Sequence, residues 1–294
     1  MTRFDSVQDV RARLRKADYL ADDRIASTVF LADRLGKPIL VEGPAGVGKT
    51  ELAKAVATVT GTPLIRLQCY EGLDESKALY EWNYKKQLLR IQADSGDRPW
   101  QEIEDDIFAE EFLLTRPLLG AIRAQEPVTL LIDEVDRVEI ETEALLLEVL
   151  SDFQVSIPEL GTVVANTRPY VILTSNNTRE LSEALKRRCL FLYIDYPEIE
   201  REKEIILTRV PELSDTLAAQ VARVVRSVRQ LELKKAPSVS ESIDWARTLL
   251  LLGARSIERD TLIDTLHVLL KYQGDIEKTG RELKLDDENP YRVL

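Results

Sequence analysis

The stretch GPAGVGKT, residues Gly43 to Thr50, decides the fold of this chain because it matches the phosphate-binding pattern GxxxxGK[ST]. A run of strand-forming residues, Pro38–Glu42, comes directly before it, and a helical pattern, Glu51–Val59, follows it. Glycines let the backbone of such a loop turn several N–H groups, and the positive end of the following helix, toward one anion. The sequence therefore predicts a strand, a phosphate-binding loop and a helix in succession.

Two side chains of the loop have predicted roles in binding ATP together with Mg²⁺. Lys49 places a positive charge on the β and γ phosphates, and the Thr50 hydroxyl is a predicted Mg²⁺ ligand. The residues predicted to contact the nucleotide are Gly43, Pro44, Ala45, Gly46, Val47, Gly48, Lys49, Thr50 and Glu51.

Length and composition define the general class of protein. With 294 residues, 44% of them hydrophobic, the chain can bury a large core, and we expect one large domain and a smaller one. No apolar run reaches the length that crosses a bilayer, and the N-terminal residues lack the apolar stretch of a signal peptide. We therefore expect a cytoplasmic protein without a transmembrane segment. The formal net charge of −11 repels nucleic acid, so no nucleic-acid partner is expected.

The chain contains two cysteines and one histidine, which are too few for zinc chemistry or for Cys/His catalysis. Cys69 and Cys189 lie far apart, each flanked by strand-forming residues, and we interpret both as small buried hydrophobes. His267 lies in an apolar helical pattern and is expected to be a packed or surface histidine.

Strand-like and helical patterns alternate up to about Tyr196, which is typical of a doubly wound α/β fold with a parallel sheet flanked by helices. After Pro197 only helical spacing remains, which predicts an all-helical C-terminal domain. The predicted domains are residues 1–196 and 197–285, with a loosely held tail at 286–294. The predicted strands are Pro38–Glu42, Pro63–Gln68, Val128–Ile132, Tyr170–Ser175 and Leu190–Ile194. The apolar residues at helical spacing are Leu217, Val221, Val224, Val225 and Val228, then Leu262, Ile263, Leu266, Leu269 and Leu270.

Two segments interrupt the α/β pattern. Tyr70–Trp100 is aromatic and charged, and it is too long for an ordinary connection between a strand and a helix, so we interpret it as an insertion. Asp152–Arg168 alternates polar and apolar residues around a proline and a glycine, which predicts a β-hairpin. Both are either packing elaborations or functional excursions, and long excursions near a nucleotide site favour function.

Two adjacent carboxylates follow the apolar run Thr129–Ile132. Asp133 is predicted to hold the Mg²⁺ shell, and Glu134 to polarise the water that attacks the γ phosphate. Acidic pairs usually cover a solvated surface. The position of this pair at the end of a buried strand instead favours Mg²⁺-dependent ATP hydrolysis.

Three further residues complete the predicted site. Asn176 follows the next strand and can help to position the attacking water. Arg187 and Arg188 end a short helix, where a cation can face the γ phosphate of a neighbouring subunit. Stabilising the C-terminal end of that helix is the alternative role for both arginines.

In this order, GPAGVGKT, LLIDEVD, TSNN, ALKRRC and a helical C-terminal region resemble an AAA+ ATPase of the MoxR family. The segments CYEGLDESKALYEWNY, EEFLLTRPLL and LLEVLSDFQVSIPELGT resemble the CoxD-like subgroup, which is associated with maturation of carbon monoxide dehydrogenase. The resemblance covers roughly residues 20–252 and depends most strongly on the ATPase motifs.

This resemblance implies a P-loop AAA+ domain with a five-stranded parallel sheet and a helical lid, assembled as a homo-oligomeric, hexameric ring. Under it, Asn176 matches the sensor-1 asparagine and Arg188 matches the arginine finger, with Arg187 as the alternative. Tyr70–Trp100 would be the helix-2 insert and Asp152–Arg168 the hairpin before sensor 1, both facing a client or the ring pore. The implied function is chaperone-like remodelling or metal-centre maturation of a client protein, such as a molybdenum hydroxylase, with a von Willebrand A-domain partner.

One position departs from the family pattern. Ser240 stands where the family carries a sensor-2 arginine, so lid closure is expected to be weaker or to depend on Lys234 or Lys235, and basal turnover is expected to be slow. Two alternatives to the remodelling ATPase remain open from the sequence. One is an ATP-gated binding module with little hydrolysis, and the other is a DNA-directed AAA+ motor.

Overall fold

A computed structural model describes residues 3–93, 99–284 and 292–293 of the chain. The chain folds into two compact units. The first contains residues 1–17, 21–42 and 50–193, and the second contains residues 194–294 together with the short stretches 18–20 and 43–49. None of the helices that the structure describes has the length and apolar character needed to cross a membrane.

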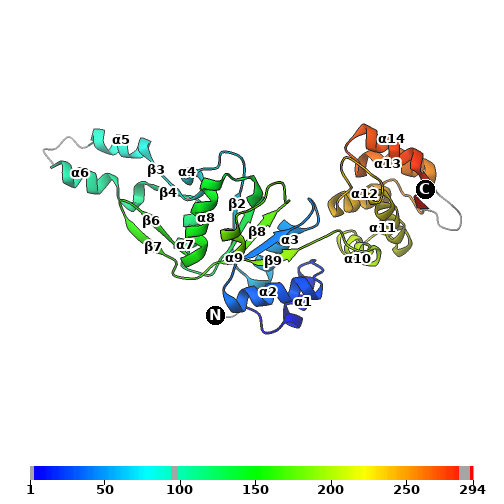
Figure 1. The fold of residues 1–294 in the computed structure, drawn as a ribbon, viewed down its shortest axis with the longest axis horizontal. Coiled ribbons are helices and arrows are strands. Elements are labelled where there is room, and N and C mark those ends of the chain that lie inside the picture. The colour runs from blue at the N-terminus through cyan, green and yellow to red at the C-terminus, as the bar shows by residue number, and fades with distance from the viewer. Residues whose placement is uncertain (1–2, 94–98, 285–291, 294) are drawn as a thin grey trace. The chain divides into compact units, whose positions relative to one another are not determined.

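The first unit is built on a five-stranded parallel sheet with the strand order β2-β5-β8-β1-β9 (Figure 1). The predicted α/β fold class is confirmed, and each predicted strand agrees with an observed one to within one residue at either end. Strands β5 and β8 are buried along their whole length, as expected of central strands covered on both faces. The strands are β1 (Ile39–Glu42), β2 (Leu64–Gln68), β5 (Thr129–Asp133), β8 (Tyr170–Ser175) and β9 (Leu190–Tyr193).

Helices pack against this sheet through apolar faces. Helix α2 contacts β1 and β9, whereas α7 contacts β2 and β5. The apolar residues of α7 that face the core, such as Leu118 and Ile122, are fully buried. The helices and 3-10 turns around the sheet are α1 (Val7–Lys16), α2 (Asp23–Leu35), α3 (Lys49–Thr60), α7 (Pro117–Arg123), η2 (Val135–Arg137), α8 (Ile140–Asp152) and α9 (Glu183–Arg188).

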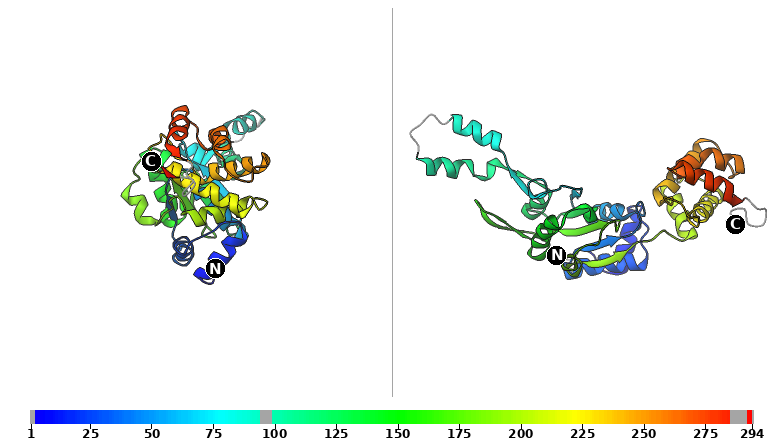
Figure 2. Two further views of the ribbon diagram at one scale, coloured as in Figure 1. Left: turned by 90° about the vertical axis from the view of Figure 1, so that its right-hand side faces the viewer. Right: turned by 45° about the horizontal axis from the view of Figure 1, so that its top comes forward.

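The excursion predicted at Tyr70–Trp100 forms a projecting arm, which we define as β3, α5, α6 and β4 (Figure 2). It runs past the predicted end at Trp100, because β3 pairs antiparallel with β4 and so returns the chain to the core only at Thr115. Residues 94–98 of the prediction lie outside the described residues. The elements are α4 (Glu75–Ala78), β3 (Tyr80–Trp82), α5 (Tyr84–Ala93), α6 (Trp100–Ile107), η1 (Glu110–Phe112) and β4 (Leu113–Thr115).

The predicted β-hairpin within Asp152–Arg168 is confirmed. It consists of β6 (Gln154–Ile157) and β7 (Gly161–Val164), which pair antiparallel. This hairpin continues directly from the C-terminal end of α8, and it extends from the same end of the first unit as the arm (Figures 1 and 2).

The second unit is a helical bundle around Trp245, which is fully buried and donates a hydrogen bond from its indole N–H to Thr265 (2.8 Å). The apolar residues predicted for its first long helix are all buried, whereas Ile263 is 44% exposed. The predicted tail at 286–294 lies mostly outside the described residues, but residues 292–293 pair with β10. The elements are α10 (Ile199–Arg209), α11 (Asp215–Arg229), α12 (Val239–Leu251), α13 (Arg259–Leu269), α14 (Gln273–Glu282), β10 (Leu283–Lys284) and β11 (Arg292–Val293).

Cys69 and Cys189 are free and buried, as predicted. Burial raises the pKa of each thiol to about 12, so both remain protonated at neutral pH. His267 is an exposed residue of α13, which agrees with a surface role.

Candidate functional site

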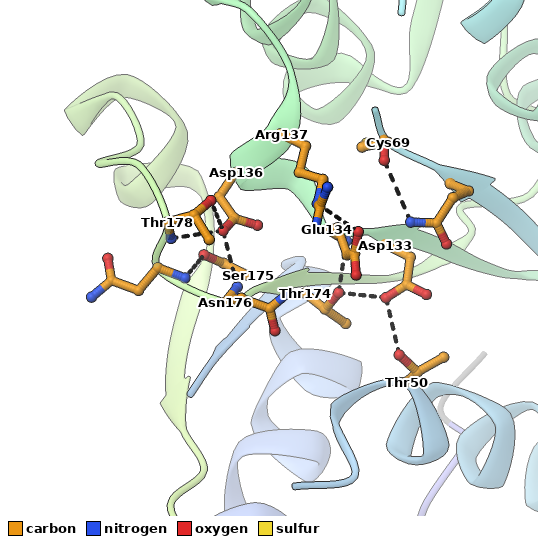
Figure 3. A network of polar contacts seen from close by, with 12 residues as sticks. Thr50, Cys69, Asp133, Glu134, Asp136, Arg137, Thr174, Ser175, Asn176 and Thr178 are labelled. Atoms are coloured by element: carbon orange, nitrogen blue, oxygen red, sulfur yellow. Dashed lines mark hydrogen bonds and ion pairs between the residues drawn. The ribbon is translucent and has the colours of Figure 1, made fainter. Parts of the chain in front are cut away.

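The carboxylate of Asp133, the last residue of β5, is the centre of a polar network at the carboxyl edge of the sheet (Figure 3). Asp133 is 3% exposed. Its Oδ1 accepts hydrogen bonds from the hydroxyls of Thr50 (3.0 Å) and Thr174 (2.5 Å), and its Oδ2 accepts one from the Arg66 guanidinium (2.5 Å). The structure thus joins Thr50 and Asp133, the two predicted Mg²⁺ ligands, although 83 residues separate them in the sequence.

Strand pairing explains how these residues meet. Gln68, the last residue of β2, is paired with Asp133. Arg66 lies two residues earlier, on the same face of β2 as Gln68, and its guanidinium reaches the Asp133 carboxylate. On the other side, β8 pairs with β5 and brings Thr174 next to the end of β5. Thr50 is the second residue of α3, directly after the loop that leaves β1.

Glu134, the predicted water-polarising residue, has a left-handed backbone conformation (φ 57°, ψ 48°). Such a conformation is uncommon for a residue other than glycine and costs on the order of 1 kcal/mol. The Glu134 N–H donates to the Thr174 hydroxyl (2.9 Å), and its carboxylate forms an ion pair with Arg137 (2.8 Å). The Glu134 side chain is about one third exposed, so it remains accessible to water.

The loop Gly43–Lys49 has the unusual backbone that the glycine pattern predicts. Gly43 has φ 148°, and a Cβ placed there would lie 1.9 Å from the carbonyl oxygen of Ile194, so no larger residue fits. The Lys49 ammonium donates to the carbonyl oxygens of Gly43 (2.6 Å) and Pro44 (2.7 Å) and is therefore held against its own loop. Glu51, a predicted nucleotide contact, forms an ion pair with Lys54 one helical turn later (2.7 Å).

The segment that carries Asn176 is held in place by Asp136, the last residue of the LLIDEVD stretch, to which the sequence analysis assigns no role. Asp136 Oδ2 accepts hydrogen bonds from the backbone N–H groups of Asn176 (3.2 Å) and Thr178 (2.8 Å) and from the Thr178 hydroxyl (2.6 Å). Burial raises the pKa of Asp136, but these hydrogen bonds outweigh it and leave the pKa below its usual value. Its position three residues after Asp133 is the one signal that the sequence offers.

A second buried carboxylate fastens the same segment farther along. Glu143 of α8 is 1% exposed, forms an ion pair with Arg179 and accepts a hydrogen bond from the Ser182 N–H (3.0 Å). Burial raises the pKa of Glu143, but hydrogen bonds from Ser182 and Arg179 lower it by more. The chain from Asn176 to α9 is therefore held against α8 and the turn before it.

The two candidate finger arginines have different surroundings. Arg188 donates to the hydroxyl of Ser151 on α8 (2.5 Å) and to the carbonyl oxygen of Ala184 (3.0 Å). Arg187 is exposed, and within the described parts of the chain we find no hydrogen bond or ion pair to its side chain. Arg188 therefore has two partners within the chain, whereas the Arg187 side chain is exposed.

The donor atoms around Asp133 fit a magnesium ion. A threonine hydroxyl and a carboxylate oxygen are hard oxygen ligands of the kind that Mg²⁺ prefers, and these two groups are already within hydrogen-bond distance. Glu134, adjacent in the chain, supplies a carboxylate that is not one of these two ligands. The arrangement can therefore hold a metal beside a second carboxylate, which is paired with Arg137 and about one third exposed.

Comparison with solved structures agrees with the fold described above. The chain superposes on a point mutant of RuvB from Thermotoga maritima with a TM-score of 0.53 at 18% identity, covering 90% of this chain and 72% of RuvB. A second point mutant of the same protein gives a TM-score of 0.52 at 18% identity, covering 88% of this chain and 69% of that one. At this identity the likeness concerns the fold alone.

Sequence relatives cover most of the chain. The gas vesicle ATPase GvpN1 of Halobacterium salinarum is 26% identical over 269 residues, covering 86% of this chain and 75% of GvpN1. An uncharacterized protein of Staphylococcus haemolyticus is 24% identical over 258 residues, covering 84% of this chain and 90% of that protein. The sequence model of the "ATPase family associated with various cellular activities (AAA)" matches residues 39–195, which is more than half of the chain and includes every residue of the network around Asp133. The chain therefore belongs to the AAA family of ATPases.

Proposed function

We propose that this AAA ATPase hydrolyses Mg²⁺-bound ATP at the carboxyl edge of its sheet and uses the energy to remodel a client protein. The hydrogen bond between Thr50 and Asp133 carries the proposal, because it joins the two residues predicted to hold the metal. The proposed functional division follows the predicted domains, with residues 1–196 as the nucleotide-binding core and 197–285 as the lid.

Each residue of the site has a distinct role in this proposal. The loop N–H groups and Lys49 bind the phosphates, Thr50 and Asp133 would hold the metal, and Glu134 accepts the proton of the attacking water. Mg²⁺ supplies positive charge that stabilises the phosphates during transfer. Asn176 orients the water, and Asp136 keeps the backbone at Asn176 in place.

Two observations support a protein client. The arm and the β6–β7 hairpin extend from the same end of the first unit (Figure 2). On α5, the side chains of Tyr84, Leu88 and Ile91 recur at helical spacing and are 67, 57 and 36% exposed. An exposed apolar row of this kind is typical of a surface that binds another protein.

The finer assignment rests on the resemblance to the MoxR family and its CoxD-like subgroup. On that basis, we propose a hexameric ring and a molybdenum-containing carbon monoxide dehydrogenase as the client, with a von Willebrand A-domain partner. The named relative GvpN1, a gas vesicle ATPase, supports ATP hydrolysis and does not identify this client.

The surroundings of the two arginines favour Arg187 over Arg188 as the residue that reaches a neighbouring subunit. Arg188 already bonds Ser151 in its own subunit, and losing that contact would leave a partly buried guanidinium without its partner. We propose that Arg187→Ala lowers turnover of the assembled ring with nucleotide binding unchanged. If Arg188→Ala lowers turnover in this way and Arg187→Ala does not, the finger is Arg188, the residue that matches the family pattern.

In this proposal, Ser240 occupies the sensor-2 position. It is exposed near the start of α12, while the Lys234 ammonium lies over the ring of Tyr272 (4.1 Å) and Lys235 pairs with Glu241 (3.4 Å). Both lysines have partners within the second unit, which supports slow basal turnover.

Lys49→Ala tests the nucleotide site directly. Fluorescent ATP-analogue titration should show loss of binding by about 100-fold or more, since the variant removes a charge from the β and γ phosphates. Lys54→Ala is the matched control because it removes an exposed lysine from the same helix. Equal affinities of the two variants would refute the loop assignment.

Glu134→Gln tests hydrolysis separately from binding. We expect normal ATP affinity and a rate of phosphate release lowered by about 100-fold or more. Glu141→Gln, which changes an exposed carboxylate on α8, should leave the rate unchanged. If wild-type protein releases phosphate no faster than Glu134→Gln while binding ATP tightly, the chain is an ATP-gated binding module.

A further inference from the structure

The Thr174 hydroxyl connects the two adjacent acids of the site. It donates to Oδ1 of Asp133 (2.5 Å) and accepts from the N–H of Glu134 (2.9 Å; Figure 3). A backbone N–H can only donate and an ionised carboxylate can only accept, so the direction of both hydrogen bonds is fixed. The single hydroxyl proton therefore points at Asp133.

Burial makes this connection firm. Thr174 is 1% exposed and Asp133 is 3% exposed. Water does not compete for these hydrogen bonds, and hydrogen bonds are electrostatically stronger in such surroundings than in water. A β-branched side chain in a strand also has few rotamers, so the hydroxyl has little freedom to turn away.

The Glu134 N–H belongs to a residue in the left-handed conformation, with φ 57°. The direction in which the Glu134 side chain leaves the backbone depends on that conformation. By accepting the Glu134 N–H, the Thr174 hydroxyl holds it in place. The same atom thus orients the proposed metal ligand Asp133 and the proposed water-activating residue Glu134.

We infer that Thr174 is a positioning residue for ATP hydrolysis, which sets the relative orientation of Asp133 and Glu134 through its hydroxyl. This inference rests on the proposed function of the same site. It assigns a catalytic consequence to Thr174, the first residue of the TSNN stretch, in which the sequence analysis gives a role only to Asn176. Thr174 lies on the strand next to the one that carries both acids, and it touches neither the loop nor the predicted sensor side chain through any hydrogen bond that the structure describes.

A second buried threonine provides the matched control. Thr129, at the start of the neighbouring strand β5, is fully buried, and its hydroxyl bonds the hydroxyl of Thr62 (2.8 Å). Thr129 and Thr174 both lie in central strands of one sheet, but only Thr174 bonds the two acids. Replacing either by valine removes one buried hydroxyl at nearly constant volume.

The experiment compares Thr174→Val, Thr174→Ser and Thr129→Val in the full chain. We expect Thr174→Val to lower kcat by about 10- to 100-fold, the size of effect that a small misplacement of reacting groups produces, with KM for ATP changed by less than about threefold. Thr174→Ser keeps the hydroxyl and should recover most of kcat. Thr129→Val should keep kcat close to that of wild type. Equal kcat for Thr174→Val and wild type, or equal losses in the two valine variants, would overturn the inference.

A binding measurement gives a readout other than activity. The Mg²⁺ concentration that half-saturates binding of a fluorescent, non-hydrolysable ATP analogue should rise several-fold in Thr174→Val, because Asp133 loses the donor that orients it. In Thr129→Val it should not change. A structural role alone would leave this concentration the same in all three variants.

Two additional variants keep the outcome interpretable. If Thr174→Val does not fold, Thr174→Ala removes the same hydroxyl with less steric demand and should show the same loss of kcat. Glu134→Gln, measured alongside, separates the two failures. An inactive Glu134→Gln with a fully active Thr174→Val defeats the inference about Thr174 alone, whereas a fully active Glu134→Gln defeats the proposed function.

Discussion

The two units each bury a carboxylate beside an arginine, but they hold it in different ways. In the first unit, Asp133 pairs with Arg66, whose side chain is 48% exposed, and takes its other hydrogen bonds from two threonine hydroxyls. In the second unit, Glu202 of α10 pairs through both oxygens with Arg229 of α11, and the two side chains are 1 and 5% exposed.

Further contacts hold the Arg229 side chain in place. Its guanidinium also donates to the carbonyl oxygen of Pro237 (2.8 Å) and lies over the ring of Tyr196 (4.3 Å), while Ser242 donates to Glu202 (2.7 Å). The pair in the second unit therefore holds α10, α11 and α12 together. Arg66, by contrast, can leave Asp133 by moving into water. The looser arrangement of the first unit suits the proposed role of Asp133, in which the carboxylate exchanges Arg66 for a metal ion.

Breaking the buried pair should give the largest effect. Arg229→Met leaves Glu202 as an unpaired buried charge, so we expect the free energy of unfolding of the second unit to fall by about 3–5 kcal/mol in denaturant titrations followed by circular dichroism. Arg226→Met on the same helix is the control, because its pair with Glu198 is exposed and contributes below about 1 kcal/mol. A similar small loss in both variants would mean that the buried pair is not what joins the helices.

Asp136 is 2% exposed, and its described partners are N–H and hydroxyl groups rather than an arginine. We therefore expect its replacement to change the free energy of unfolding by an amount between those for the two arginine pairs. Asp136→Asn should destabilise the first unit by about 1–3 kcal/mol at neutral pH. The pKa of Asp136 is lowered in the folded state, so its stabilisation is fully present above the ordinary carboxylate pKa of about 3.9 and is lost as pH falls through the lowered value.

The stability difference between wild type and Asp136→Asn should therefore be constant from about pH 7 to about pH 5 and should narrow below about pH 4. Thermal unfolding across this range measures it. A difference that widens on acidification would contradict the assigned direction of the pKa shift.

Replacing Arg66, the more exposed arginine, should give the smallest change in stability. Arg66→Gln should alter the free energy of unfolding by less than about 1 kcal/mol. It should also lower the Mg²⁺ concentration that half-saturates nucleotide binding by about threefold, since a positive charge beside the proposed metal ligand is removed. Arg116→Gln, which breaks the half-exposed pair with Glu81, should not change the Mg²⁺ dependence. An unchanged Mg²⁺ dependence in Arg66→Gln would show that the guanidinium does not compete for Asp133.

The sequence predicts the parts of this molecule that depend on local pattern. The strand, loop and helix around Gly43–Thr50, the buried strand that ends at Asp133 and the β6–β7 hairpin each have a periodicity or a glycine requirement within a few residues. Because parallel strands end at one edge, the meeting of Thr50 with Asp133 also follows from the sequence.

The remaining features depend on which strands and helices become neighbours. Thr174 and Arg66 reach Asp133 because β8 and β2 pair with β5. The sequence of one strand does not show which residue of another strand lies beside it. Strand β4 has three residues and escapes prediction, because its pairing with β3 rather than its own pattern defines it. The spacing of the sequence does not show which of Arg187 and Arg188 reaches Ser151, because that depends on how the end of α9 lies against α8.

Helix α8 has a mechanical consequence for this ATPase. Its 13 residues form a rod roughly 20 Å long, which is tied near its beginning to Ser182 through Glu143 and near its end to Arg188 through Ser151. Strand β6 starts two residues after this rod ends, and both β6 and α9 contact α8. We therefore expect a rotation of α8 to change the orientation of the hairpin and of α9 together.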